Sequence, residues 1–358
     1  MLKVLHVAET IKGGVATVLR QLLSDRSEER ELYCLVPDAH RKELHEFDNE
    51  NALFFKRSGR DVKSLLSLLV NYIRFIKQHR PEIIHIHSSF AGVVCRSVLP
   101  FVYLWYRPKV VYCPHAFSFI MNVSEKKKKI YSLIERTLLT FTDRVVCTSR
   151  YEMNEAIKWG IKESKCKVVY NGIPAPKASD SETHEALCED EIKILYVGRF
   201  DYQKGFDVLL QVANRLPAGM HITAIGDVVH ADESPPPHEN ISYLGWLDYR
   251  LIVPHFNNST LLLMPSRWES FGLVAVEAQS FGLPVVASRC SSLPEVVDEG
   301  RTGFLFETEN VDEIISILNS KTKNDWKSMH QSCIDYYSDK FTSKIMLKEI
   351  NRLYNELM

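Results

Sequence analysis

The sequence predicts an α/β fold with two Rossmann-like β/α/β domains that face a central cleft. Strand and helix signals alternate along the chain, and the apolar runs lack the strict alternation of strands with one exposed face. A polar stretch from Ala175 to Glu191, rich in Ser, Glu and Asp, separates one alternating array from a second. The 358 residues also exceed the usual size of one domain. We therefore expect an N-terminal domain at 1–172, a C-terminal domain at 173–341 and a closing helix at 342–358.

The first array contains six strand-like runs with helical patterns between them. The strands are predicted at Lys3–Val7, Leu32–Val36, Ile83–Ile86, Lys109–Cys113, Arg144–Cys147 and Lys167–Tyr170. Apolar residues at helical spacing are clearest at Val15–Leu23, Val62–Lys77 and Lys128–Phe141.

The second array repeats this pattern after the polar stretch. Its strands are predicted at Ile192–Val197, Ile222–Ile225, Ile241–Leu244, Thr260–Met264 and Pro284–Ala287, and its helices at Phe206–Leu216 and Gly272–Ser280. The last helical pattern, Thr342–Leu357, is amphipathic, which is typical of a helix that packs against a domain.

Composition excludes several classes of protein. The formal net charge is −1, so there is no basic excess of the kind that nucleic-acid binding needs. The eight cysteines are scattered, without a C-x-x-C pair, which indicates reduced core residues of a cytoplasmic protein. No run approaches the roughly 18 apolar residues that span a bilayer. The opening MLKVLHVAET is predicted to be a strand and is too short and polar for a signal peptide.

The most informative segment is MPSRWESFGLVAVE, residues 264–277. It places Glu269 and Glu277 where an apolar strand runs into a helix, with small residues at Ser270 and Gly272. Open α/β sheets bind ligands at the carboxyl ends of their strands, and helix N-termini bind anions. The segment is therefore a candidate ligand site. On spacing alone, the segment is explained equally well if Glu269 is a helix-capping carboxylate and Glu277 is an exposed helix glutamate.

A second strand-end loop carries cations. Gly198 and Arg199 close the strand Ile192–Val197, and Lys204 opens the next helix. A guanidinium can bind two phosphate oxygens and an ammonium adds a point charge, so the loop suits a diphosphate. A solvated basic loop before a helix is the alternative.

These two loops together resemble the E-x7-E and G-R…K-G patterns of the retaining GT-B glycosyltransferases of family 4 (the group 1 glycosyltransferases), of the bacterial surface-polysaccharide type. The resemblance covers most of the chain. It implies a GT-B fold whose last helix crosses back onto the N-terminal domain. It also implies that Glu269 meets hydroxyls of the donor hexose, that Glu277 binds the ribose, and that Arg199 and Lys204 neutralise the departing diphosphate. The implied donor-binding set is Gly14, Gly198, Arg199, Lys204, Ser270, Phe271, Gly272, Leu273 and Glu277.

Histidines in the first array raise two further questions. His115 follows the strand Lys109–Cys113, where the family usually has His-Gly or His-Asp and this chain has His-Ala. The resemblance adds His115 to the catalytic set of Glu269, Arg199 and Lys204, as a residue near the reacting sugar. His85 and His87 alternate onto one face of a strand, but no third ligand is apparent, so we expect no metal there. We expect His85 to be structural and His87 to line the cleft.

The resemblance implies transfer of a hexosyl or N-acetylhexosaminyl unit from a nucleotide sugar to a glycan acceptor, with retention of configuration. UDP-sugars are the favoured donors, with GDP-mannose as the competitor. Neither a cofactor nor a metal is expected, since the chain has no suitably placed Asp-x-Asp motif and its Arg and Lys supply positive charge. A nucleotide-sugar epimerase or a non-catalytic nucleotide-sugar-binding scaffold are the alternatives.

Two segments of the first array suggest contact with a membrane. Lys126–Lys129 precede an apolar helical pattern, and VLPFVYLWYRPK is an aromatic run flanked by cations. Cations beside aromatic residues suit an anionic membrane surface. This pattern favours a lipid-linked glycan acceptor, in the synthesis of O-antigen, capsule or exopolysaccharide, with the enzyme peripheral at the cytoplasmic face. A solvated helix start and a buried helix are the alternative.

Overall fold

The computed structural model describes residues 1–25, 29–44, 47, 50–59, 61–177, 191–228 and 234–358. Most of the predicted linker, with Cys188, lies outside these ranges. Contacts divide the chain into two units, where the sequence places boundaries after 172 and 341. Unit 1 comprises Met1–Ile173 and Ser343–Met358, and unit 2 comprises Pro174–Thr342.

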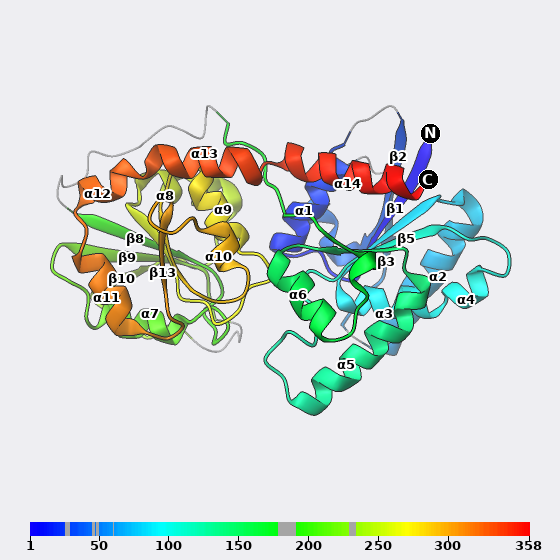
Figure 1. Ribbon diagram of the computed structural model, residues 1–358, viewed down its shortest axis with the longest axis horizontal. Helices are drawn as coiled ribbons and strands as arrows, with labels where there is room; N and C mark the ends of the chain where they lie inside the picture. The colour runs from blue at the N-terminus through cyan, green and yellow to red at the C-terminus, as the bar shows by residue number, and fades with distance from the viewer. Residues whose placement is uncertain (26–28, 45–46, 48–49, 60, 178–190, 229–233) are drawn as a thin grey trace. The chain divides into compact units, whose positions relative to one another are not determined.

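Unit 1 is built on a seven-stranded parallel sheet with the strand order β3-β2-β1-β4-β5-β6-β7 (Figure 1). Its strands are β1 (Leu2–Ala8), β2 (Arg30–Pro37), β3 (Ala52–Phe55), β4 (Ile83–His87), β5 (Lys109–Cys113), β6 (Arg144–Cys147) and β7 (Cys166–Val168). Its α-helices are α1 (Gly14–Leu23), α2 (Val62–His79), α3 (Ser89–Ser97), α4 (Leu99–Val102), α5 (Glu125–Leu138), α6 (Arg150–Lys158) and α14 (Ser343–Leu357). Short 3-10 helices are η1 (Asp38–Leu44), η2 (Leu139–Phe141) and η3 (Glu163–Lys165).

Unit 2 is built on a six-stranded parallel sheet with the order β10-β9-β8-β11-β12-β13. Its strands are β8 (Ile192–Val197), β9 (Met220–Ile225), β10 (Ile241–Tyr243), β11 (Leu261–Met264), β12 (Val285–Ser288) and β13 (Gly303–Phe306). Its helices are α7 (Phe206–Ala213), α8 (Tyr249–Asn258), α9 (Leu273–Ser280), α10 (Leu293–Val296), α11 (Val311–Asn319), α12 (Lys323–Ser328) and α13 (His330–Lys340).

The central strands are buried on both faces, which explains why their sequences lack alternation. All residues of β4, β11 and β12 are buried. A parallel strand covered by helices on both sides must be apolar throughout, unless its polar groups find partners. The two doubly wound sheets confirm the predicted fold class.

Each sheet reverses its strand order at one point. The reversal falls between β1 and β4 in unit 1 and between β8 and β11 in unit 2. At such a switch point the loops leaving two neighbouring strands diverge and leave room for a ligand at the carboxyl edge. The predicted site residues follow β1, β5, β8 and β11, so most of them lie near a switch point.

Helix α14 completes unit 1 although it follows unit 2 in the chain. The hydroxyl of Tyr354 lies 2.6 Å from Nδ1 of His85, and Arg30 donates to Asn355 at 2.9 Å. Met346, Ile350, Leu353 and Tyr354 form its buried face. The amphipathic pattern therefore marks a helix that packs against the first sheet.

The cysteines of the described residues are free thiols, and most of them are buried. Burial raises the pKa of Cys34 to about 12, as expected for a thiol in a low-dielectric interior. None of the helices within the described ranges is long and apolar enough to cross a bilayer.

Candidate active site

Two loops of unit 2 lie side by side because the strands that precede them are neighbours. Strand β8 pairs with β11, with Leu261 opposite Ile194. The loop after β8 carries the predicted diphosphate residues, and the loop after β11 carries the predicted glutamates. The backbone N–H of Arg267 donates to the carbonyl of Gln203 at 2.8 Å, which joins the two loops directly.

Lys204 and Glu269 form an ion pair at the centre of these loops. The ammonium of Lys204 lies 2.5 Å from Oε1 of Glu269, and the hydroxyl of Ser266 donates to the same oxygen at 2.9 Å. The side chain of Glu269 is 6% exposed and that of Lys204 is 20% exposed. The pair thus places both signs of charge in a partly desolvated position, where a charge interacts more strongly than in water.

Arg199 lies at the rim of the same site. Its guanidinium contacts Asp201 at 3.0 Å and the side-chain oxygen of Gln203 at 2.7 Å, and the side chain is 46% exposed. Arg199 can leave these two partners and turn toward a phosphate at little cost in stability, because exposed ion pairs contribute little to the stability of the fold.

The segment from Ser270 to Glu277 divides between core and site. Phe271 is buried and makes an edge contact with Phe341, so its side chain belongs to the core and only its backbone can meet a donor. Gly272 caps helix α9 with φ 91°, a conformation that favours glycine. Leu273 begins the helix, and Glu277, half-buried, lies one turn further along it. The N-terminus of α9 therefore follows Glu269 closely.

Gly205 holds the lysine loop against the strand end of β11. Its φ is 67°, and a Cβ added there would lie 1.9 Å from the carbonyl oxygen of Pro265. We expect Gly205→Ala to destabilise the protein by roughly 2–4 kcal/mol, from backbone strain together with the clash. Gly219→Ala is the matched control, since its φ is 80° but nothing lies within 4 Å. Urea denaturation should show a clearly larger loss for Gly205→Ala; equal losses would contradict the close approach.

Arg267 is a site residue that the sequence analysis missed. Its guanidinium binds both carboxylate oxygens of Asp207 at 2.7 Å, donates to the carbonyl of Tyr202 at 2.7 Å, and also contacts Glu309. It lies over the ring of Tyr202 at 3.7 Å. Arg267 therefore ties the two loops together. The sequence carried one signal of this contact, because Arg267 shortly precedes Glu269 and Asp207 shortly follows Lys204.

Gly14 and His115 lie in unit 1. Gly14 is the first residue of α1, after a Gly13 with φ 56°. His115 is partly exposed in the turn after β5, where it and Ala116 both have positive φ, at 52° and 109°. The buried carboxylate of Glu152 accepts the Ala116 N–H at 2.9 Å and so holds this turn. A family glycine at Ala116 would be less strained there.

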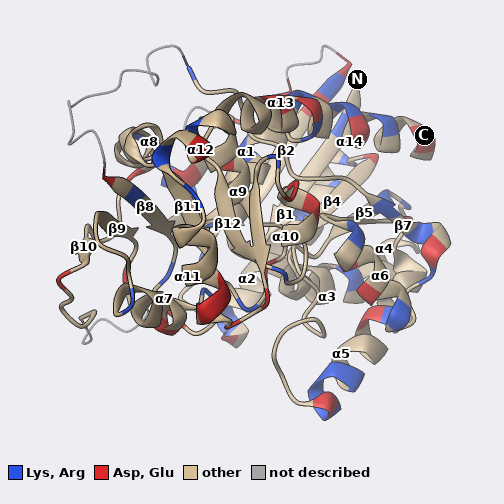
Figure 2. Ribbon diagram, turned by 60° about the vertical axis from the view of Figure 1, so that its left-hand side comes forward, with Lys and Arg blue, Asp and Glu red and all other residues tan. Residues whose placement is uncertain are grey.

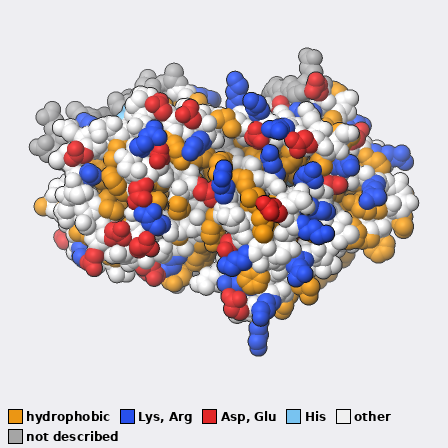
Figure 3. All heavy atoms as spheres, in the orientation of Figure 1, with side chains coloured by type: hydrophobic (Ala, Val, Ile, Leu, Met, Phe, Trp, Pro, Cys, Tyr) orange, Lys and Arg blue, Asp and Glu red, His pale blue; other side chains and the backbone are white. Residues whose placement is uncertain are grey.

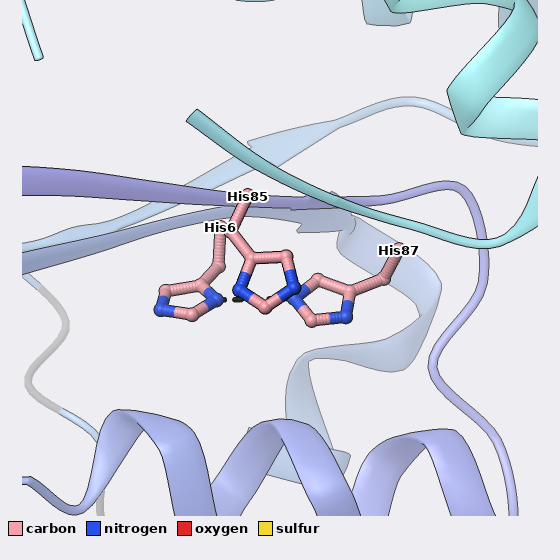
Figure 4. Close-up of side chains that lie close together, drawn as sticks. All are labelled: His6, His85 and His87. Carbon is pink, nitrogen blue, oxygen red and sulfur yellow. Dashed lines mark hydrogen bonds between the residues drawn. The ribbon is translucent and has the colours of Figure 1, made fainter. Parts of the chain in front are cut away.

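Buried histidines meet at the switch point of unit 1, behind His115. His6 on β1 lies opposite His85 on β4, and Figure 4 shows these two rings converging with that of His87. A third potential ligand does accompany His85 and His87, contrary to the expectation, because His6, His85 and His87 are close enough to hold an ion, as are His87, Cys113 and His115. The expectation that His87 lines a cleft is also wrong, since His87 is 1% exposed.

Comparisons with known proteins agree with this arrangement of loops. Residues 12–175 match the model for Glycosyltransferase Family 4, and residues 180–338 match that for Glycosyl transferases group 1. An uncharacterised 41.2 kDa protein in the cps region of Klebsiella pneumoniae is 39% identical over 360 residues, or 99% of each chain. The chain is a family 4 glycosyltransferase.

One further relative and one solved structure extend the comparison. An Escherichia coli UDP-Gal:alpha-D-GlcNAc-diphosphoundecaprenol alpha-1,3-galactosyltransferase is 25% identical over 322 residues, covering 84% of this chain and 80% of that one. The crystal structure of Anabaena HepE in complex with UDP and glucose superposes with a TM-score of 0.80 at 18% identity, over 99% of this chain and 100% of that one. This glycosyltransferase therefore has the GT-B fold. The family 4 match includes Gly14 and His115, and the group 1 match includes Arg199 to Glu277.

Proposed function

We propose that this glycosyltransferase moves a hexosyl or N-acetylhexosaminyl unit from a nucleotide diphosphate sugar to a glycan, with retention of configuration and without a metal. The observation that carries the proposal is the Lys204–Glu269 pair at the switch point of unit 2, with Arg199 beside it. Cations suit the diphosphate, and a carboxylate a few ångströms away suits the hydroxyls of the sugar attached to it.

The chemistry we propose follows from where charge develops. As the glycosidic bond breaks, negative charge grows on the diphosphate, and Lys204, Arg199 and the N-terminus of α9 stabilise it. These groups provide the positive charge that a divalent cation would otherwise supply. The acceptor hydroxyl attacks on the face that the diphosphate leaves, and a diphosphate oxygen takes its proton. Glu269 orients the hexose, Glu277 binds the ribose, and His115 hydrogen-bonds the sugar near the reacting carbon.

For the substrates, we propose a UDP-sugar and a lipid-linked glycan, in the assembly of a bacterial surface polysaccharide at the cytoplasmic face of the membrane. The E. coli relative is named for a UDP-sugar donor and a diphosphoundecaprenol acceptor, and the Klebsiella relative is encoded in a cps region. HepE was crystallised with UDP. GDP-mannose is the donor to test against.

A thermal-shift screen against UDP, GDP, ADP and their sugar conjugates tests the donor site. A ligand that binds only the folded state raises the melting temperature, by about 2.7 kcal/mol of stabilisation at a hundred times its Kd. We expect UDP and UDP-sugars to stabilise the protein and EDTA to leave the shift unchanged. Stabilisation by GDP alone would reverse the donor assignment, and a shift abolished by EDTA would contradict metal independence.

Helix α5 gives the proposed membrane contact its structural form. Lys126, Lys127 and Lys129, near its N-terminus, are exposed. The next turns expose Ile130, Leu133 and Ile134, at 56%, 62% and 36%. Residues three and four apart lie on one helix face, so Ile130, Leu133 and Ile134 form an apolar stripe, and Lys126 and Lys129 extend the same face toward the start of the helix. Figure 2 shows the blue lysine positions at the start of α5, and Figure 3 shows blue side chains with orange ones near them at the lower edge of the face in view.

Replacing Lys126, Lys127 and Lys129 with serine should weaken binding to vesicles that contain anionic lipid about 100-fold. Each cation near an anionic headgroup layer contributes about 1 kcal/mol, so three contribute about 3 kcal/mol. Vesicle sedimentation measures the effect. Serine at Lys63, Lys77 and Lys348, which are exposed elsewhere on unit 1, is the control. An equal loss from both triple variants would show that overall charge, rather than α5, drives binding.

A further inference from the structure

A continuous chain of hydrogen-bonded imidazoles runs from the core of unit 1 to His115. Nδ1 of His6 lies 3.0 Å from Nε2 of His87, and Nδ1 of His87 lies 3.0 Å from Nε2 of His115. The three residues come from β1, β4 and the turn after β5, which are consecutive in the sheet. Both nitrogens of His87 are thus engaged with other histidines, while Nδ1 of His115 lies outside the chain of bonds.

Desolvation favours the neutral form of these imidazoles, of which His6 and His87 are buried and His115 is partly exposed. Desolvation lowers the pKa of His6 to about 3 and that of His115 to about 4. The pKa of His87 is also held well below its usual value, first by desolvation and then by its histidine neighbours. A neutral imidazole has one N–H donor and one lone pair, so each ring in the chain must donate on one side and accept on the other.

This requirement couples the tautomers of all three rings. If His6 donates from Nδ1, His87 must donate from Nδ1 to His115, whose own proton is then on Nδ1. If His115 donates from Nε2, His87 donates from Nε2 to His6, and Nδ1 of His115 is an acceptor. The chain can run in either sense, but a mixture within it would set two lone pairs or two N–H groups against each other.

We propose that His6 and His87 are positioning residues that tie the neutral tautomer of His115 to their own, in one common sense of the imidazole chain, and so determine whether its Nδ1 donates to or accepts from the substrate. The proposal rests on the function proposed above, in which His115 faces the sugar. It explains why polar side chains occupy the centre of an otherwise apolar sheet. The turn held by Glu152 fixes the backbone of His115, and the imidazole chain fixes its ring.

A metal ion is the competing occupant of this cluster. His85 also belongs to it, with Nδ1 bonded to Tyr354 and with Nε2, among the described residues, lacking a hydrogen-bond partner. However, a metal needs the lone pairs of His6 Nδ1 and His87 Nε2 to converge on the ion, whereas these atoms face each other at hydrogen-bond distance. The geometry therefore favours the hydrogen-bonded imidazole chain over a bound metal ion, and metal analysis of the purified protein distinguishes these two possibilities.

Histidine-selective ¹⁵N NMR of the full chain, together with transfer kinetics, tests the proposal. In the wild type we expect His6, His87 and His115 to be neutral and each in one tautomer, all with the same sense. His6→Leu removes the inner end of the chain. His6→Asn places an amide oxygen or nitrogen where Nδ1 of His6 was, and so preserves a hydrogen-bond partner for His87. We expect His6→Leu to give His115 mixed tautomers and to lower kcat on the order of 10- to 100-fold, a loss typical of a misplaced catalytic group. The donor KM should change little, and His6→Asn should recover most of the rate.

Tyr354→Phe is the matched control, since it removes the hydrogen bond of His85 while leaving the chain intact. It should change neither the tautomer of His115 nor kcat, and melting temperatures check that each variant is folded. The proposal is overturned if His115 keeps its tautomer and rate in His6→Leu, or if one equivalent of a transition metal copurifies and is lost in that variant. If His115 has a single tautomer in the wild type but His115→Ala keeps full activity, the role of His115 in the proposed function is overturned, and with it the positioning role.

Discussion

Lys204→Ala and Glu269→Ala should each lower kcat by about 100- to 1,000-fold or more while leaving the protein folded. Lys204 is assigned to the charge that grows on the departing diphosphate, and removing one preorganised group of this kind typically costs that much. Glu269 is assigned to the hexose and also holds the ammonium of Lys204 at 2.5 Å. Transfer of labelled sugar to an acceptor, measured under saturating donor, reports the loss.

The double variant separates a catalytic role from a structural one. Each single substitution leaves a partly buried charge without its partner, whereas Lys204→Ala/Glu269→Ala removes both charges. The double variant should therefore be at least as stable as the less stable of the two single variants, yet no more active than either of them. Lys193→Ala, at the opposite end of β8, is the control and should keep wild-type activity. Near wild-type turnover in both single variants would refute the site assignment.

Acidification should destabilise unit 1 strongly well before the carboxylates titrate. His6, with a pKa of about 3, stays neutral in the folded state, while an unfolded histidine binds a proton below about pH 6.5. The unfolded state then binds more protons, so stability falls as the pH falls through this window. His6 alone accounts for about 1.4 kcal/mol per pH unit, or about 2 kcal/mol between pH 6.5 and 5. His85 and His87, whose pKa values are lowered by burial, act in the same direction.

Calorimetry at pH 7.5, 6.5, 5.5 and 5.0 measures this effect. Because His85 and His87 act in the same direction as His6, the transition of unit 1 should move to lower temperature as the pH falls. Glu152, whose pKa burial raises, opposes the trend as a single group. His6→Asn should reduce the loss of stability between pH 6.5 and 5 by about 2 kcal/mol. His330→Asn, at an exposed position, should not change it. An unshifted transition would mean that the histidines are not buried as neutral groups.

The fold was predictable because the strands nearest the centre of each sheet are continuous apolar runs with clear ends. TLLLMP and IKILYV both became strands within a residue of the expected bounds, and they proved to be the neighbours that bring the two site loops together. Strands β3 and β13 and most of the shorter helices, among them α12 and α13, were not predicted. β3 is only four residues long, and α13 has a weak pattern because its buried positions are few.

The two candidate loops could be singled out from the sequence, because each follows an apolar strand, whereas contacts between residues far apart in the sequence could not. The family resemblance assigned Glu269 and Lys204 to one donor, and the structure places these two side chains in contact. By contrast, His6 lies 81 residues from its partner His87, and only the strand order brings them together. The motif also did not reveal that the side chain of Phe271 is buried in the core, which leaves only its backbone for the predicted contact with a donor.

The return of α14 to unit 1 has a consequence for synthesis on the ribosome. Between Ile173 and Ser343 the ribosome adds about 170 residues, which takes roughly 9–34 s at 5–20 residues per second. During that interval the apolar surface around His85 that Tyr354 later covers has emerged without its helix. Unit 2, whose residues are contiguous, can be complete before the first unit is. The earlier half of the nascent chain thus exposes this surface for some seconds, and a pause in translation within unit 2 would lengthen that exposure.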